Sequence, residues 1–150
     1  MKPDTTVLLV EDNPQQRELA ELTLQECCDP QRLATAADAA EALDFLLGRG
    51  AHATRASHLQ PRLVILSLPL ARSNDLQVLK SIRAHPPTRS VPVVAMLPAE
   101  AAQEEFDRCY QAGANSVVRK SADAGEQQRK LRHACEFWIK VNEADRNTRF

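Results

Sequence analysis

Four side chains that could do chemistry stand at or just past the ends of short apolar runs: Glu11, Asp12, Ser67 and Lys120. The adjacent carboxylates of Glu11 and Asp12 repel phosphate unless a cation lies between them. Ser67 offers a hydroxyl, which is a poor nucleophile at neutral pH without an adjacent general base. Which of these groups can act together depends on the elements that carry them.

The run Leu63–Leu68 is the centre of the predicted fold. Five of its residues are aliphatic, apolar and polar residues do not alternate, and Pro61 and Pro69 bound it. An unbroken short apolar run of this kind predicts a strand buried on both faces, in the middle of a parallel sheet. Open α/β sheets carry their chemistry at the carboxyl ends of such strands, and Ser67 lies at that end.

Further apolar runs alternate with helical patterns along the whole chain. The predicted strands cover residues 6–10, 32–36, 63–68, 92–97 and 116–119. The predicted helices begin after Asn13-Pro14 and at Asp38, cover 75–84 and 100–112, and begin again near Asp123 to run past Trp138. This alternation predicts an α/β fold, a doubly wound five-stranded parallel sheet flanked by five helices.

In such a sheet the ends of the first, third, fourth and fifth strands lie side by side. These ends are Glu11-Asp12, Ser67, Leu97-Pro98 and Lys120. The two acids could alternatively be a loop and a helix N-terminus that favour negative charge. Lys120 could be solvated, but we expect it to pair with Asp12 or Glu11 and to fill the cleft between the strand ends.

Length and charge narrow the class of protein. The 150 residues predict one domain, with a core at about 5–144 and a polar tail at 145–150. Lys and Arg total 19 against 20 Asp and Glu, a formal charge of −1, which offers no general attraction to nucleic acid or anionic lipid. Without a signal-peptide core or a run near roughly 18 apolar residues, we expect a soluble cytoplasmic protein.

Motif searches exclude several functions. Neither a dinucleotide-binding glycine motif nor a P-loop follows the first strand. Ser67 lies in L-S-L-P rather than in the G-x-S-x-G turn of α/β-hydrolases, and no histidine is placed to activate it. The four cysteines form no C-x-x-C pair, which predicts reduced, mostly buried thiols rather than a zinc site.

The segments VLLVEDNP, LVILxLxL, QAGANS and VVRK together resemble the receiver domain of two-component response regulators, a flavodoxin-like fold, over Val7 to about Glu143. The long loop before the central strand, GANSVVRKS and FWIKVNE are most similar to small single-domain receivers associated with bacteriophytochromes. The resemblance implies that an aspartate at the Ser67 position accepts a phosphoryl group from a kinase phosphohistidine. It also implies that two acids, here Glu11 and Asp12, hold Mg²⁺, while a hydroxyl ending the fourth strand and the lysine contact the phosphoryl group.

This chain departs from that pattern at most of the positions that serve phosphorylation. Ser67 replaces the acceptor aspartate, Leu97 or Pro98 replaces the switch hydroxyl, and Val117 replaces the switch aromatic residue. Three further positions differ from the family pattern: Ser121, Ala71 and Asp75. Glu11, Asp12 and Lys120 match, so we expect at most a weak or vestigial Mg²⁺ site and no other cofactor.

These departures predict a pseudo-receiver, a non-enzymatic module that binds a histidine kinase or a phytochrome-type photoreceptor kinase without being phosphorylated. The alternative is a working response regulator that accepts a phosphoryl group on another carboxylate, such as Asp12 or Asp75.

The last predicted helix carries an apolar stripe that points to self-association. The stripe contains Leu131, Cys135, Trp138, Ile139 and Val141, and its far turns have no obvious partner within the chain. The resemblance implies dimers formed through the fourth helix, fifth strand and fifth helix. We therefore expect a constitutive two-fold homodimer on that face.

Overall fold

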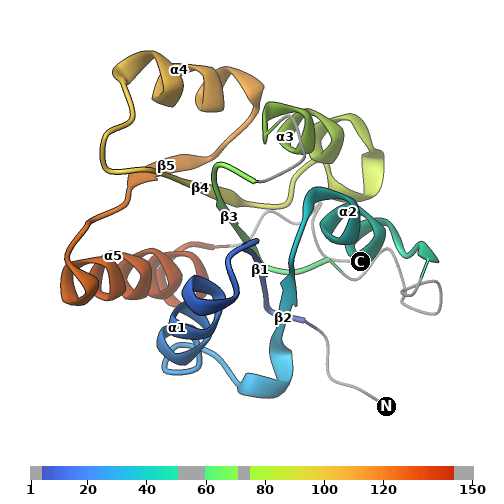
Figure 1. Cartoon of the computed structure of the whole chain (residues 1–150). Helices are drawn as coiled ribbons and strands as arrows, with labels where there is room; N and C mark the ends of the chain where they lie inside the picture. The colour runs from blue at the N-terminus through green and yellow to red at the C-terminus, as the bar shows by residue number, and fades with distance from the viewer. Residues whose placement is uncertain (1–4, 51–59, 71–74, 144–150) are drawn as a thin grey trace.

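A computed structural model describes residues 5–50, 60–70 and 75–143 of the chain. Within them a five-stranded parallel sheet has the order β2-β1-β3-β4-β5 (Figure 1). The strands are β1 (Val7–Val10), β2 (Leu33–Ala36), β3 (Leu63–Ser67), β4 (Val93–Leu97) and β5 (Ser116–Arg119). The helices are α1 (Pro14–Leu24), α2 (Ala39–Leu47), α3 (Asp75–Ala84), α4 (Gln103–Ala112) and α5 (Ala124–Glu136), and α5 continues as a π-helix over Phe137–Val141. The predicted fold class is confirmed.

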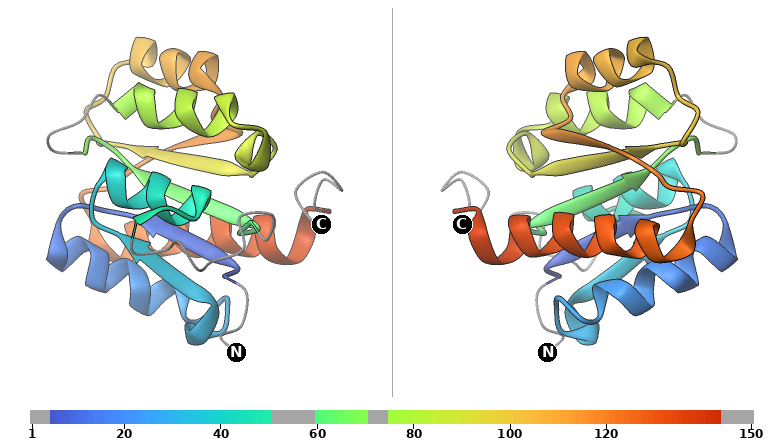
Figure 2. Two further views of the ribbon diagram at one scale, coloured as in Figure 1. Left: turned by 90° about the vertical axis from the view of Figure 1, so that its right-hand side faces the viewer. Right: turned by 90° about the vertical axis from the view of Figure 1, so that its left-hand side faces the viewer.

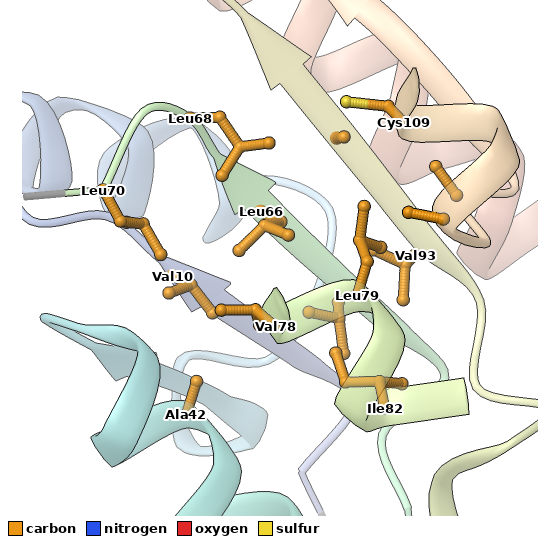
Figure 3. Packing of buried hydrophobic residues seen from close by; sticks show 14 of the residues in the cluster. Val10, Ala42, Leu66, Leu68, Leu70, Val78, Leu79, Ile82, Val93 and Cys109 are labelled. Atoms are coloured by element: carbon orange, nitrogen blue, oxygen red, sulfur yellow. The ribbon is translucent and has the colours of Figure 1, made fainter. Parts of the chain in front are cut away.

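The helices cover the two faces of the sheet unequally (Figure 1). α2, α3 and α4 pack on one face, where β1, β3 and β4 contribute Val10, Leu66 and Val93 to a large apolar core (Figure 3). α1 and α5 cover the other face over a smaller core that includes Leu9, Ile65 and Met96. The alternation of side chains along a strand sends neighbouring residues to opposite cores, so the central strands need apolar residues at nearly every position.

Local sequence signals set the helix ends. Asn13 Oδ1 accepts hydrogen bonds from the N–H groups of Gln15 and Gln16, and Asp38 Oδ1 accepts one from Glu41. These are the N-cap contacts that the two polar residues predict. Gly48 ends α2 in the left-handed region at φ 64°, which a glycine adopts without steric cost.

Arg83 of α3 links the end of α4 to the segment before β4 and to the segment before β5. Its guanidinium donates to the carbonyl oxygens of Gly113, Arg89 and Val91 and to Asn115 Oδ1. Gly113 ends α4 at φ 117°, and a Cβ added there would lie 2.6 Å from Arg83 Cγ. Glycine at this position therefore serves both the backbone conformation and the approach of Arg83.

The buried face of α1 differs from the one predicted. The sequence predicts a stripe of Leu19 and Leu22 with Leu24 at its flank, yet Leu19 and Leu22 are 40% and 58% exposed, whereas Leu24 is buried. The side of α1 that faces the sheet carries Ala20, Thr23 and Leu24 instead, spaced at three and four residues as a helix face requires. This rotation of α1 leaves Leu19 and Leu22 at the surface.

The four cysteines carry reduced thiols, as predicted. Cys27, Cys109 and Cys135 are buried, and Cys28 is half-buried. Burial raises the pKa of the Cys135 thiol, and the neighbouring Cys27 thiol raises it further. A thiol that stays protonated is a weak nucleophile, so Cys135 serves the packing of α5 against α1. Among the described residues, the helices are all too short or too polar to cross a membrane.

Candidate functional site

The sheet brings the predicted strand ends together. Glu11 follows β1 directly, Ser67 ends β3, and Lys120 follows β5. β1 pairs with β3 through Val10 and Leu66, and β3 pairs with β4 through Ser67 and Met96. The backbone N–H of Lys120 donates to the carbonyl oxygen of Leu97, 2.7 Å away, which joins the ends of β4 and β5.

Ser67 and Glu11 form a buried hydrogen-bonded pair. The Ser67 hydroxyl donates to Glu11 Oε1 at 2.7 Å, and the backbone N–H of Asn13 donates to Oε2 at 3.1 Å. Ser67 is 5% exposed and Glu11 is 8% exposed. A buried carboxylate without such donors would be costly, so the serine hydroxyl stabilises the acid beside it.

The expectation that Ser67 has no adjacent general base is wrong, because Glu11 is in contact with its hydroxyl. The ends of the paired strands β1 and β3 are necessarily neighbours, which brings Glu11 next to Ser67. The contact still does not make a hydrolase site. Ser67 is almost fully buried, and the glycine-flanked turn that exposes a nucleophilic serine is absent from the sequence around it.

Lys120 approaches the end of β3 from the side opposite Glu11, because β5 and β1 lie on opposite sides of β3 in the sheet. Its Nζ donates a hydrogen bond to the carbonyl oxygen of Leu68, 2.9 Å away. Leu68 is the residue that follows Ser67. Lys120 and Asp12 are both half-buried. The contact with Leu68 holds the lysine amine over the end of β3, and pairing of Lys120 with Asp12 or Glu11 stays a prediction.

The acid pair is a poor fit for Mg²⁺. Mg²⁺ prefers several oxygen ligands in octahedral geometry, and in this chain a hydroxyl replaces the carboxylate that would complete the set. Both carboxylate oxygens of Glu11 already accept hydrogen bonds. Within residues 5–50, 60–70 and 75–143, His, Cys, Asp and Glu side chains form no group of three or more that could hold a metal. The Glu11 and Asp12 site therefore lacks the donors of a strong Mg²⁺ site.

The two switch positions hold aliphatic side chains. Leu97 ends β4 and is buried, whereas Pro98 is half-buried. Both border a groove of about 390 Å³ beside α4. Val117 is half-buried against the larger core. None of these three side chains can donate a hydrogen bond to an incoming anion.

Arg119 is a functional candidate that sequence reasoning missed. Its guanidinium donates to the carbonyl oxygens of Ala99 and Ala101 and lies 4.4 Å from the centre of the Phe106 ring. These contacts hold the loop between β4 and α4 against β5. The switch positions implied by the resemblance, at the end of β4 and on β5, lie next to this loop. In the sequence Arg119 is recognisable only as a basic residue next to Lys120. A basic residue at such a position is typical of a solvated surface charge.

The predicted dimer stripe divides into a core part and a surface part. Leu131 and Cys135 are buried under α1 in the smaller core, so neither can form interface surface on the folded chain. Trp138 and Ile139 pack partly against the same core, and Val141 is 66% exposed. Phe137, outside the predicted stripe, is 47% exposed and meets Trp138 edge to face with ring centroids 5.3 Å apart.

Comparison with known proteins places the chain among signalling domains. A family model described as the response regulator receiver domain matches residues 7–132. Response regulator Rcp1 of Synechocystis sp. is 24% identical over 139 residues, which is 93% of this chain and 92% of Rcp1.

Solved structures agree with this placement. The phosphorylated cyanobacterial phytochrome response regulator RcpA superimposes with a TM-score of 0.84 at 25% identity, covering 95% of this chain and 99% of RcpA. The bacteriophytochrome response regulator AtBRR superimposes with a TM-score of 0.71 at 30% identity, covering 95% of this chain and 97% of AtBRR. These similarities extend over almost the whole chain.

Proposed function

Since the chain belongs to the response regulator receiver domain family, we propose that it acts in a two-component system as a pseudo-receiver, which binds its partner without being phosphorylated. In this proposal it is not an enzyme. Its partner is a sensor histidine kinase, and the names of the similar proteins favour one of the phytochrome type.

The observation that carries the proposal is the hydrogen bond between Ser67 and Glu11. Phosphoryl transfer to a receiver needs a carboxylate at the acceptor position and a cation to offset its charge. Here the acceptor position holds a hydroxyl that donates a hydrogen bond to the carboxylate of Glu11. The hydroxyl at the acceptor position and the acid beside it are thus hydrogen-bonded to each other within the protein.

A partner would dock most readily on α1. Leu19 and Leu22 expose apolar side chains on this helix, next to the strand ends that hold Glu11 and Ser67. Exposed leucines on a helix whose other face is buried are typical of interaction surfaces. The kinase would contact this face whether or not the cleft can be phosphorylated.

The same proposal includes a homodimer formed by the far end of α5. The last turns of this helix extend past the strands (Figure 2). Phe137 and Val141 expose apolar surface there, and Trp138 meets the Phe137 ring edge to face. A patch at the end of one helix can meet its own copy across a two-fold axis, which buries both patches at once.

Incubation with acetyl phosphate and Mg²⁺, followed by intact mass measurement, tests the central claim. We expect the wild-type protein to gain no phosphoryl group. The matched variant Ser67→Asp should gain one weakly, because it restores the acceptor carboxylate but not the hydroxyl or aromatic residue of the switch.

A phosphoryl group on the wild-type protein, mapped to this cleft, would overturn the proposal. The variants Asp12→Asn and Asp75→Asn would then identify the acceptor, and loss of the added mass in either would establish the alternative of a working response regulator. Phosphoryl transfer from a cognate kinase to Asp12 or Asp75 would likewise establish a working response regulator.

A further inference from the structure

A cavity of about 220 Å³ lies between α1, α5 and the sheet. Its apolar wall is formed by Leu9, Ile65 and Met96, which project from β1, β3 and β4 on the face covered by these helices. The cavity is a separate feature from the groove beside α4, because the lining residues of the two do not overlap.

The cavity exists because the helices present small or polar residues to this part of the sheet. α1 contributes Gln16 and Ala20, and α5 contributes Ala124 and Gln128. Farther along the same helices, large residues such as Leu24 and Leu131 pack closely on the sheet. The cavity is open to solvent along the two helices, where its lining residues Gln16, Leu19 and Ala124 are exposed.

One end of the cavity is polar and belongs to the strand ends. Glu11 lies two residues after Leu9, and Ser67 lies two residues after Ile65, so each pair shares a face of the sheet. Glu11, Ser67 and Lys120 all line the cavity. The Ser67 hydroxyl donates a hydrogen bond to Glu11, which leaves lone pairs on Ser67 Oγ that can accept a hydrogen bond from a bound molecule.

We propose that this cavity binds a small neutral aromatic molecule that carries one O–H or N–H donor. The ring would lie against Leu9, Ile65 and Met96, and the donor would bond to Ser67 Oγ. An apolar cavity of about 150 Å³ holds benzene, so the larger volume here admits a ring with substituents. A neutral molecule fits because Glu11 and Lys120 bring opposite charges to the polar end. The proposal does not depend on whether the protein is phosphorylated.

Titration of the isotope-labelled full chain with para-cresol and with toluene, followed by amide chemical shifts, tests the site. We expect both probes to shift resonances of cavity-lining residues at millimolar concentration, with para-cresol binding more tightly. Ser67→Ala should weaken para-cresol binding about tenfold and leave toluene binding unchanged, because only para-cresol donates to Ser67. Equal affinity of the two probes, or equal loss of both in Ser67→Ala, would overturn the assignment of the donor.

Variants that fill the cavity supply the control. Ala20→Leu from α1 and Ala124→Leu from α5 should each abolish binding of both probes while the protein stays folded. Ala40→Leu, on the exposed side of α2, should bind them as the wild type does. Should one filling variant unfold, the other tests the site from the opposite wall. Failure of either probe to bind, or binding that survives a folded filling variant, would overturn the proposal.

Discussion

At the scale of single residues, one substitution changes the character of the cleft. A serine at the end of β3 donates to the buried Glu11 carboxylate, where an aspartate would repel it. The serine therefore removes the need for a metal ion between the two side chains.

Truncating the hydroxyl should cost stability. Ser67→Ala deprives Glu11 Oε1 of its donor, and we expect the free energy of unfolding to fall by about 1–3 kcal/mol. Urea denaturation measures the change. In a Glu11→Gln background the same truncation should cost less, because no buried charge loses a partner. Equal costs in the two backgrounds would show that the hydrogen bond to the carboxylate contributes nothing specific.

Replacing Ser67 by aspartate should make stability depend on pH and on Mg²⁺. Ser67→Asp places two carboxylates at adjacent strand ends, and their repulsion at pH 7 should lower the free energy of unfolding by about 2–4 kcal/mol. The deficit should shrink as the pH falls towards 5, since protonation of one carboxylate relieves the repulsion, and it should shrink on addition of Mg²⁺.

Thermal denaturation of the two proteins with and without Mg²⁺ measures this difference. The wild-type protein should respond little to Mg²⁺, because Glu11 already accepts from Ser67 and Asn13. Submillimolar Mg²⁺ affinity of the wild type by calorimetry would contradict the view that its metal site is vestigial.

At the scale of elements, helix ends and loops in this chain are held by individual side chains rather than by the sheet alone. Arg83 fastens the end of α4 to α3 and to the start of β4, and Arg119 fastens the loop before α4 to β5. Burial lowers the pKa of Arg83, yet an arginine keeps its charge at any ordinary pH. The α4 segment is therefore anchored at both ends.

A substitution at Gly113 tests how firmly Arg83 holds the end of α4. Gly113→Ala should lower the free energy of unfolding by more than 2 kcal/mol, about 1–2 kcal/mol for the left-handed backbone and the rest for displacing Arg83. Gly48→Ala is the matched control, because Gly48 also ends a helix at positive φ and should carry the backbone cost alone. Chemical denaturation compares the two variants. A Gly113→Ala cost no larger than that of Gly48→Ala would show that Arg83 moves aside freely.

At the scale of the whole molecule, the exposed large apolar residues of the described segments lie on α1, at the far end of α5 and, in the case of Tyr110, on α4. Leu19 and Leu22 are on α1, and Phe137 and Val141 are at the far end of α5. α1 lies beside the cleft, whereas the end of α5 lies past the sheet (Figure 2). One molecule could therefore dimerise through α5 and still present α1 to a kinase.

Light scattering at micromolar concentration tests the dimer. We expect a dimer mass for the wild type and a monomer mass for Phe137→Glu combined with Val141→Glu, since a charge in an apolar interface loses its hydration without gaining a partner. Leu22→Glu on α1 is the control, because its side chain is similarly exposed and should leave the dimer intact. A monomeric wild type, or a dimer that survives the double variant, would contradict the interface.

Local pattern was enough to predict the sheet and the grouping of the site residues. Apolar runs mark the strands, caps such as Asn13 and Asp38 mark the helix starts, and parallel strands necessarily bring Glu11, Ser67 and Lys120 to one edge. Each of these inferences depends on a residue and its near neighbours in the sequence, or on a rule of topology that holds for the whole fold class.

The tertiary structure decided what the pattern left open. The rotation of α1 turns Ala20, Thr23 and Leu24 towards the sheet, whereas hydrophobicity alone favoured Leu19 and Leu22. The same packing of α1 against α5 removes Leu131 and Cys135 from the predicted interface and leaves the cavity behind Ser67. The direction of the Ser67 hydroxyl towards Glu11 is likewise set by two strands 56 residues apart in the sequence. These features arise from contacts between distant segments, whose geometry no local pattern encodes.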